Sequence, residues 1–205
     1  MVLDPICPWC YIGFRGLDWA TMALYFEFDL KVHYRPFRLD ADTPSGGKDR
    51  AATLARKFRD PEVRTQMEKA LKEAMLDVGL EFDLRTPTLI PDTTDAHRLL
   101  RWAHEEEVPH DMAAALFEAY WQHGEDLSQH DVLCMVAERA GLDKMAIAKR
   151  LNSHEDVKDV QEEAAEFRAG GVAGVPAYIV NEQTGFEGAL PKAQLLEALR
   201  KLAVE

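Results

Sequence analysis

Two cysteines lie three positions apart near the start of the chain, in the stretch DPICPWCYIG that runs from Asp4 to Gly13. A Cys-x-x-Cys pair can exchange between dithiol and disulfide, or it can supply half of a zinc site. Pro8 suits the first turn of a helix, because that turn leaves its N–H groups unpaired in any case. Cys7 would then lie at a helix N-terminus, where partial positive charge favours the thiolate. We therefore expect Cys7 to be the nucleophile of disulfide exchange and Cys10 to be the resolving thiol.

A structural metal site would need two further ligands at a regular spacing, and the chain has no second Cys pair and no such His pair. The third cysteine, Cys134, lies in a helical pattern and is expected to be a small core residue. Several histidines are scattered through predicted helices and could converge only in space: His97, His104, His110, His123 and His130. No metal is therefore expected. The Pro8-Trp9 pair between the cysteines also has no packing role that would explain two inert thiols.

The amino-acid composition and net charge limit the kinds of molecule that the protein is expected to bind. The chain has 205 residues, 24 Lys or Arg against 36 Asp or Glu, and a formal net charge of −12. Nucleic acids and anionic membranes attract clusters of Lys and Arg, so neither partner is expected. No run of about 18 apolar residues could span a bilayer, and no secretory signal precedes the cysteines. We expect a cytoplasmic protein, monomer or homodimer, without a bound cofactor. Its partners would be protein thiols and disulfides or glutathione.

The order of predicted elements indicates an α/β domain with an insertion. A helix is expected over residues 14–25, and alternation of Leu30, Val32 and Tyr34 with polar residues predicts a strand over 29–37. Residues 48–169 read as one helix after another. A strand at 177–180, a return near 186–187 and an amphipathic closing helix complete the chain. The prediction is one domain formed by residues 1–47 and 170–205, interrupted by an inserted all-helical domain, 48–169.

Four stretches in this order resemble the DsbA-like thioredoxin-fold family: DPICPWCYIG, YRPF, TTDAHRLLRWA and GVAGVPAYIV. The resemblance is to the FrnE branch, which is close to 2-hydroxychromene-2-carboxylate isomerases and kappa-class glutathione transferases. It implies a thioredoxin fold with the Cys-x-x-Cys at the start of the first helix and a cis Val175–Pro176 bond facing it. Val175 and Pro176 would bind substrate by pairing backbone with an extended chain. From the residues alone, Pro176 could equally be an ordinary trans proline.

The resemblance also singles out residues around the cysteines. Pro8 and Trp9 are expected at the substrate-binding surface, and an uncharged Trp9, where DsbA proteins often carry His, implies a less oxidising pair. His97 and Arg98 fall in the helical-domain motif, so Arg98 could hold a substrate carboxylate or pair with Asp95 in its own helix. Relatives carry a full strand before the aspartate of DPICPWC. Here only three residues precede it, so the strand is stubby or the true start lies upstream.

The favoured function is a thiol–disulfide oxidoreductase or isomerase that exchanges its Cys7-Pro8-Trp9-Cys10 dithiol with protein disulfides. The alternative is a glutathione-dependent isomerase or transferase acting on a small aromatic substrate. In those relatives the first motif position is typically Ser, whereas this chain has Cys at both positions. A third possibility is a chaperone-like binder whose activity does not need the cysteines.

Overall fold

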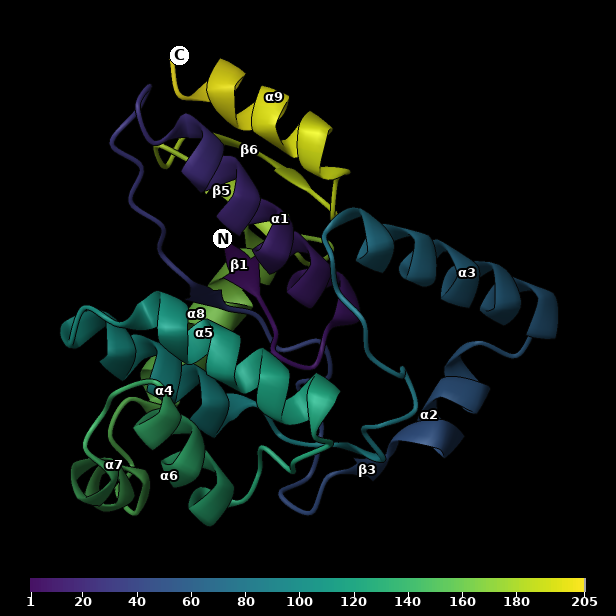
Figure 1. Cartoon of the computed structure of the whole chain (residues 1–205). Coiled ribbons are helices and arrows are strands. Elements are labelled where there is room, and N and C mark those ends of the chain that lie inside the picture. The colour runs from purple at the N-terminus through teal and green to yellow at the C-terminus, as the bar shows by residue number, and fades with distance from the viewer. Residues whose placement is uncertain (205) are drawn as a thin grey trace.

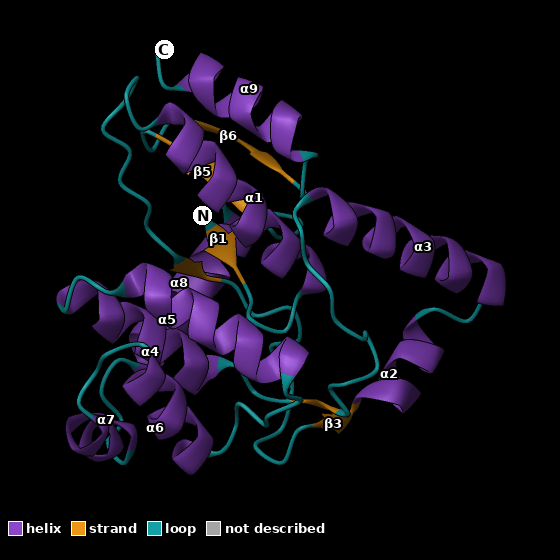
Figure 2. Ribbon diagram, viewed as in Figure 1, coloured by secondary structure: helices purple, strands orange, loops and turns teal. Residues whose placement is uncertain are grey.

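The computed structural model describes residues 1–204. Its strands are β1 (Val2–Leu3), β2 (Arg35–Pro36), β3 (Lys48–Asp49), β4 (Leu89–Ile90), β5 (Ala177–Val180) and β6 (Thr184–Glu187). Its helices are α1 (Pro8–Leu24), α2 (Arg50–Lys57), α3 (Pro61–Asp77), α4 (Thr94–Glu105), α5 (Pro109–Phe117), α6 (His130–Arg139), α7 (Lys144–Leu151), α8 (Val157–Ala169) and α9 (Lys192–Leu202). A π-helical turn, η1 (Glu118–Gln122), extends α5. Figure 2 shows that helices dominate and that the strands are short.

Four strands form one sheet in the order β2-β1-β5-β6. β1 is parallel to β2 and antiparallel to β5, and β5 and β6 form an antiparallel hairpin. Side chains alternate across this sheet, so Leu3 and Tyr178 join the main core whereas Val2 and Ala177 belong to a smaller cluster on the other face. The helices α1 and α9 lie against one another over the main-core face (Figure 1). This is the thioredoxin-type arrangement that the sequence predicts.

The segment before β2 is only partly a strand. Leu30 and Val32 are half-buried and Tyr34 is buried, while the residues between them are exposed, as the predicted alternation requires. Ladder pairing is nevertheless confined to Arg35 and Pro36, opposite Val2 and Leu3. The short β1 offers no partner for the residues before His33, whose carbonyl accepts from the Met1 amino group at 2.7 Å.

The helical block packs around α4, which contacts α5, α6 and α8. Trp102 and Trp121 are completely buried there. The helix α8 also packs against β2, so the end of the predicted insertion covers the sheet as well as the helical block. By contrast, α2 lies away from the body at the far end of α3 (Figure 1), and no residue of α2 is buried, whereas Leu71 and Met75 of α3 belong to the main core. No helix among residues 1–204 is long and apolar enough to cross a membrane.

Candidate redox site

Cys7 is the residue that immediately precedes α1, with extended backbone angles (φ −88°, ψ 117°) and Pro8 as the first helical residue. The Cys7 N–H donates to the Asp4 carbonyl at 3.0 Å, and the Cys7 carbonyl accepts from the Cys10 N–H at 3.1 Å. These bonds hold both cysteines on the first turn of α1. Cys7 is 4% exposed and Cys10 is fully buried, so only Cys7 reaches the surface at all.

The Val175–Pro176 peptide bond is cis, as the resemblance implies. The Cys7 thiol donates to the Val175 carbonyl at 3.5 Å, which joins two segments 168 residues apart. Val175 is half-buried and Pro176 is buried. Pro176 packs on Gly13 of α1 so closely that a Cβ placed there would lie 2.9 Å from the Pro176 Cγ atom. A glycine one turn after Cys10 thus allows the cis-proline segment to approach the cysteines.

Cys10 is protected by its surroundings. Burial raises the pKa of the Cys10 thiol well above its usual value, and the neighbouring Cys7 raises it further. The thiol of Cys10 therefore stays protonated at neutral pH. This asymmetry matches the separate roles expected of the two cysteines.

Asp4 is a further titratable group beside the cysteines, and the sequence analysis did not identify it. Its carboxylate accepts from the Leu39 N–H at 2.7 Å and from the Ile6 N–H at 3.3 Å. Burial outweighs these bonds and raises the pKa of Asp4 to about 7. The carboxyl group acts electrostatically on Cys10 and can gain or lose a proton near neutrality. A single carboxyl group inside the apolar run VLDPI was the available sequence signal.

Pro8 and Trp9 form the accessible rim of the site. Both are half-buried, and Trp9 packs partly against the core instead of standing free in solvent. Behind them, the hydroxyl of Tyr178 in β5 is buried against Gly13 and has no hydrogen-bond partner among the described residues. Burial and the nearby Cys10 raise the pKa of that hydroxyl.

The structure corrects the expectation of substrate contact for His97 and Arg98, because both are almost completely buried. The Arg98 guanidinium donates to Asp95 at 2.7 Å and to main-chain carbonyls at the end of α7, including Arg150 at 2.8 Å. It thereby ties α4 to α7. His97 Nε2 bonds the Phe37 carbonyl at 3.0 Å, and burial lowers the pKa of His97 to about 4.

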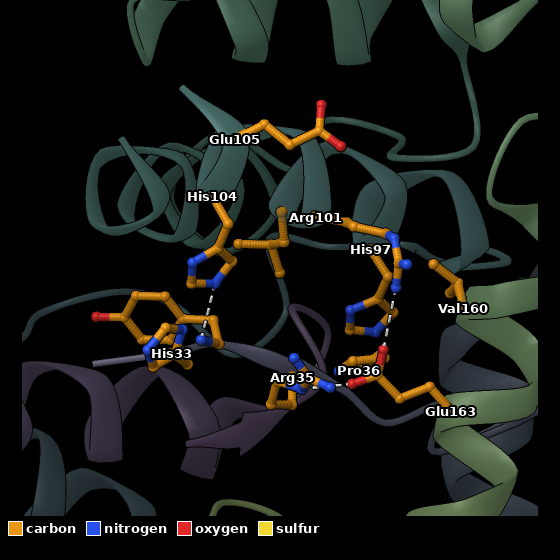
Figure 3. A pocket seen from close by; sticks show the side chains of 11 residues that line it. His33, Arg35, Pro36, His97, Arg101, His104, Glu105, Val160 and Glu163 are labelled. Carbon is orange, nitrogen blue, oxygen red and sulfur yellow. Dashed lines mark hydrogen bonds and ion pairs between the residues drawn. The ribbon is translucent and has the colours of Figure 1, made fainter. Parts of the chain in front are cut away.

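His97 belongs to a separate cavity of about 330 Å³ between α4, α8 and the start of β2. Figure 3 shows Arg35 and Arg101 converging on Glu163, at 2.5 Å and 3.4 Å. His104 Nε2 accepts from the Tyr34 N–H at 3.1 Å, and its ring lies parallel to that of His33. We call this the histidine pocket, defined by His33, Arg35, His97, Arg101, His104 and Glu163. Within residues 1–204 no group of three His, Cys, Asp or Glu side chains is arranged to hold a metal ion.

Comparison with known proteins agrees with this geometry. The family model described as "DSBA-like thioredoxin domain" matches residues 1–200. The chain is similar to the crystal structure of a probable DsbA oxidoreductase from Streptomyces coelicolor, with a TM-score of 0.88 and 24% identity over 100% of this chain and 88% of that one.

Two other solved structures share the fold. A 2-hydroxychromene-2-carboxylate isomerase gives a TM-score of 0.71 at 17% identity, over 98% of this chain and 93% of that one. The cytosolic disulfide reductase DsbM from Pseudomonas aeruginosa, solved with GSH, gives a TM-score of 0.66 at 18% identity, over 97% of each chain. At these identities the likeness shows the fold alone.

Proposed function

Because the chain belongs to the DSBA-like thioredoxin domain family, we propose that it catalyses thiol–disulfide exchange through Cys7 and Cys10 with protein disulfides. One observation carries the proposal. The sulfur of Cys7 lies at the start of α1, 3.5 Å from the Val175 carbonyl beside the cis proline, with a second, buried thiol one turn further on. An extended substrate chain that pairs with the Val175 backbone would bring its own sulfur to Cys7.

The exchange proceeds in two steps. The Cys7 thiolate attacks one sulfur of a substrate disulfide, which forms a mixed disulfide and releases the other substrate sulfur as a thiolate. Cys10 then loses its proton and attacks the Cys7 sulfur, which releases the remaining substrate thiolate and leaves a Cys7–Cys10 disulfide. Two electrons pass from the dithiol to the substrate, and the reverse sequence oxidises a substrate dithiol. Glutathione is proposed as the small thiol that restores the starting state.

Asp4 has a proton-handling role in this scheme. Its carboxylate lies beside Cys10, and its pKa of about 7 lets it take up a proton at neutral pH. Cys10 must give up a proton in the second step, although burial opposes its ionisation. We assign Asp4 as the group that offsets this cost. Pro8, Trp9, Val175 and Pro176 are assigned to the surface on which the substrate lies.

The alternative function is a glutathione-dependent isomerase or transferase, and the likeness to 2-hydroxychromene-2-carboxylate isomerase supports considering it. The presence of two thiols, of which Cys10 is fully buried and protonated, favours redox exchange over a site that only holds glutathione. A cytoplasmic location fits this proposal, since the DsbM neighbour is described as cytosolic.

Trapping of mixed disulfides tests the assignment of roles. Cys10→Ser is expected to accumulate a covalent adduct with a disulfide-containing peptide, because the resolving step is blocked. Cys7→Ser is expected to form none and to lose exchange completely, and Cys134→Ser serves as the control that retains both behaviours. If Cys7→Ser kept full exchange, the assignment would be reversed. If the double variant Cys7→Ser/Cys10→Ser kept full activity, a binding protein without redox chemistry would be indicated instead.

A further inference from the structure

The helix α2 is unusual in this molecule because it is amphipathic and yet buries none of its residues. Leu54 and Phe58, one turn apart, are half-buried and belong to neither hydrophobic core cluster. A helix of eight residues is marginal on its own. The Asp49 carboxylate caps α2 by accepting from the Ala52 N–H at 2.6 Å, and the β3–β4 pair anchors its start. The apolar side chains of α2 thus lie outside both hydrophobic core clusters.

The charge of α2 is opposite to that of the rest of the chain. Residues 48–59 carry five Lys or Arg and a single acidic residue, Asp49, in a chain of net charge −12. Arg56, Lys57 and Arg59 are exposed and form no ion pair with any residue between 1 and 204. The helix dipole favours cations in the last turn, which accounts for Arg56 and Lys57, and Lys57 also lies over the Phe58 ring, 5.7 Å from its centre.

Contacts through Trp121 connect the start of α2 to the loop that precedes Cys7. Arg50 donates to the Leu84 carbonyl at 2.7 Å and lies over the Trp121 ring, 5.2 Å from its centre. The Trp121 indole in turn donates to the Pro5 carbonyl at 3.1 Å, two residues before Cys7. The start of α2 is thus linked through the buried Trp121 to the loop that precedes Cys7.

We propose that the α2 surface, formed by Leu54, Arg56, Lys57, Phe58 and Arg59, docks acidic segments of polypeptide substrates close to their reactive cysteine. This proposal rests on the thiol–disulfide exchange proposed above and specifies its substrate class. The exposed cations supply the charge complementarity, and Leu54 and Phe58 supply apolar contact. Contact between the α2 surfaces of two copies would bring like charges together, which disfavours a symmetric dimer at this surface.

Kinetics with matched peptides test the docking. Two cysteine-disulfide peptides of equal length, one flanked by glutamates and one by lysines, are compared with the uncharged bis(2-hydroxyethyl) disulfide. Wild-type protein is expected to exchange with the acidic peptide about tenfold faster than with the basic one at low salt, and the preference should vanish at about 1 M salt. The triple variant Arg56→Glu/Lys57→Glu/Arg59→Glu should reverse the preference without changing the rate with the uncharged disulfide.

Two further variants keep the test decisive. The neutral set Arg56→Gln/Lys57→Gln/Arg59→Gln avoids acidic residues at a helix C-terminus and should abolish the preference. The control set Lys149→Glu/Lys158→Glu/Lys201→Glu changes the net charge by as much as the α2 glutamate triple variant does. Its positions are exposed on α7, α8 and α9, so the control set should retain the preference for the acidic peptide.

Several results would overturn the docking proposal. These are equal wild-type rates for the two peptides, an unchanged preference in the α2 variants, or an equal loss in the control set. Binding to anionic vesicles that depends on α2, without any peptide preference, would overturn it in favour of a membrane surface. Absence of exchange with all three disulfides would instead refute the proposed function itself.

Discussion

The candidate site around Cys7 and Cys10 and the histidine pocket each contain a fully buried titratable group. The two regions differ in the partners that their charged and titratable side chains have. In the histidine pocket the charged side chains are paired, with Arg35 and Arg101 on Glu163. Around Cys10 and Asp4 the hydrogen-bond partners are mainly main-chain groups, and burial raises both pKa values. Asp4 thus keeps a raised pKa in spite of two main-chain hydrogen bonds, whereas Glu163 is paired with two arginines.

Replacing Asp4 should have the largest effect on stability. The pKa of Asp4 is raised from 3.8 to about 7, so folding stability falls as pH rises between these values. Each pKa unit is worth about 1.4 kcal/mol, which sets an upper limit of about 4 kcal/mol above pH 7. Asp4→Asn is therefore expected to raise the free energy of unfolding by about 2–4 kcal/mol at pH 8 and to slow exchange.

Urea unfolding at several pH values measures this effect, and the gain should shrink as pH falls toward 4. An Asp4→Asn protein that is destabilised equally at pH 5 and pH 8 would show that the carboxylate is not strained by burial.

His97 should show the opposite pH dependence. Burial lowers the pKa of His97 from 6.5 to about 4, so stability is lost as pH falls through this range, up to about 3 kcal/mol. Between pH 4 and pH 6.5 the contributions of Asp4 and His97 to the pH dependence of stability have opposite signs and largely cancel. His97→Gln keeps a donor for the Phe37 carbonyl but cannot titrate. It should gain stability relative to wild type as the solution is acidified, and a constant difference across pH would contradict this.

Gly13→Ala should break the contact between α1 and the cis-proline segment. Its Cβ would collide with the Tyr178 hydroxyl and lie 2.9 Å from Pro176, so we expect a loss of about 1–3 kcal/mol and slower exchange. Gly16→Ala in the same helix is the matched control. Its Cβ would come closest to the end of the Leu195 side chain, at 3.2 Å, and the better helix propensity of alanine should offset that contact. Similar thermal stability of the two variants would show that the close approach at Gly13 is unimportant.

Arg35→Gln should have the smallest effect. Its ion pair with Glu163 is half-exposed, so the loss should be below about 1 kcal/mol and should decrease with added salt. Exchange kinetics should not change, because the histidine pocket is separate from the cysteines. A large loss of exchange activity would remove the functional distinction between the two regions.

Local signals predicted the parts of this molecule that depend on neighbouring residues. The bounds 177–180 of β5 were predicted as the structure has them, and the cis Val175–Pro176 bond followed from the family resemblance. The strand over 29–37 was too long, since alternation predicts which face is buried but not whether a neighbour is present to pair with. Pairing needs β1, which has only two residues.

The pairing of Arg98 with Asp95 was one of the two predicted alternatives and is present, but the other partners of Arg98 and the burial of Asp4 depend on distant segments and were missed. Nothing near Arg98 in the sequence shows that carbonyls from the end of α7 surround its guanidinium. Likewise, the burial that raises the pKa of Asp4 comes from the assembled sheet and helices, and one hydrogen bond comes from Leu39. Spacing predicted a cysteine pair at the start of a helix, whereas the electrostatic surroundings of the two thiols required the fold.

A redox titration of the purified protein in glutathione buffers, with free thiols trapped and counted at each ratio, tests the central claim most directly. The account predicts one reversible two-electron transition that involves Cys7 and Cys10 and leaves Cys134 reduced. The midpoint would also separate a reductant from an oxidant, since about 30 mV corresponds to about 1.4 kcal/mol for this couple. Cys7 and Cys10 remaining reduced across the whole range would contradict the account.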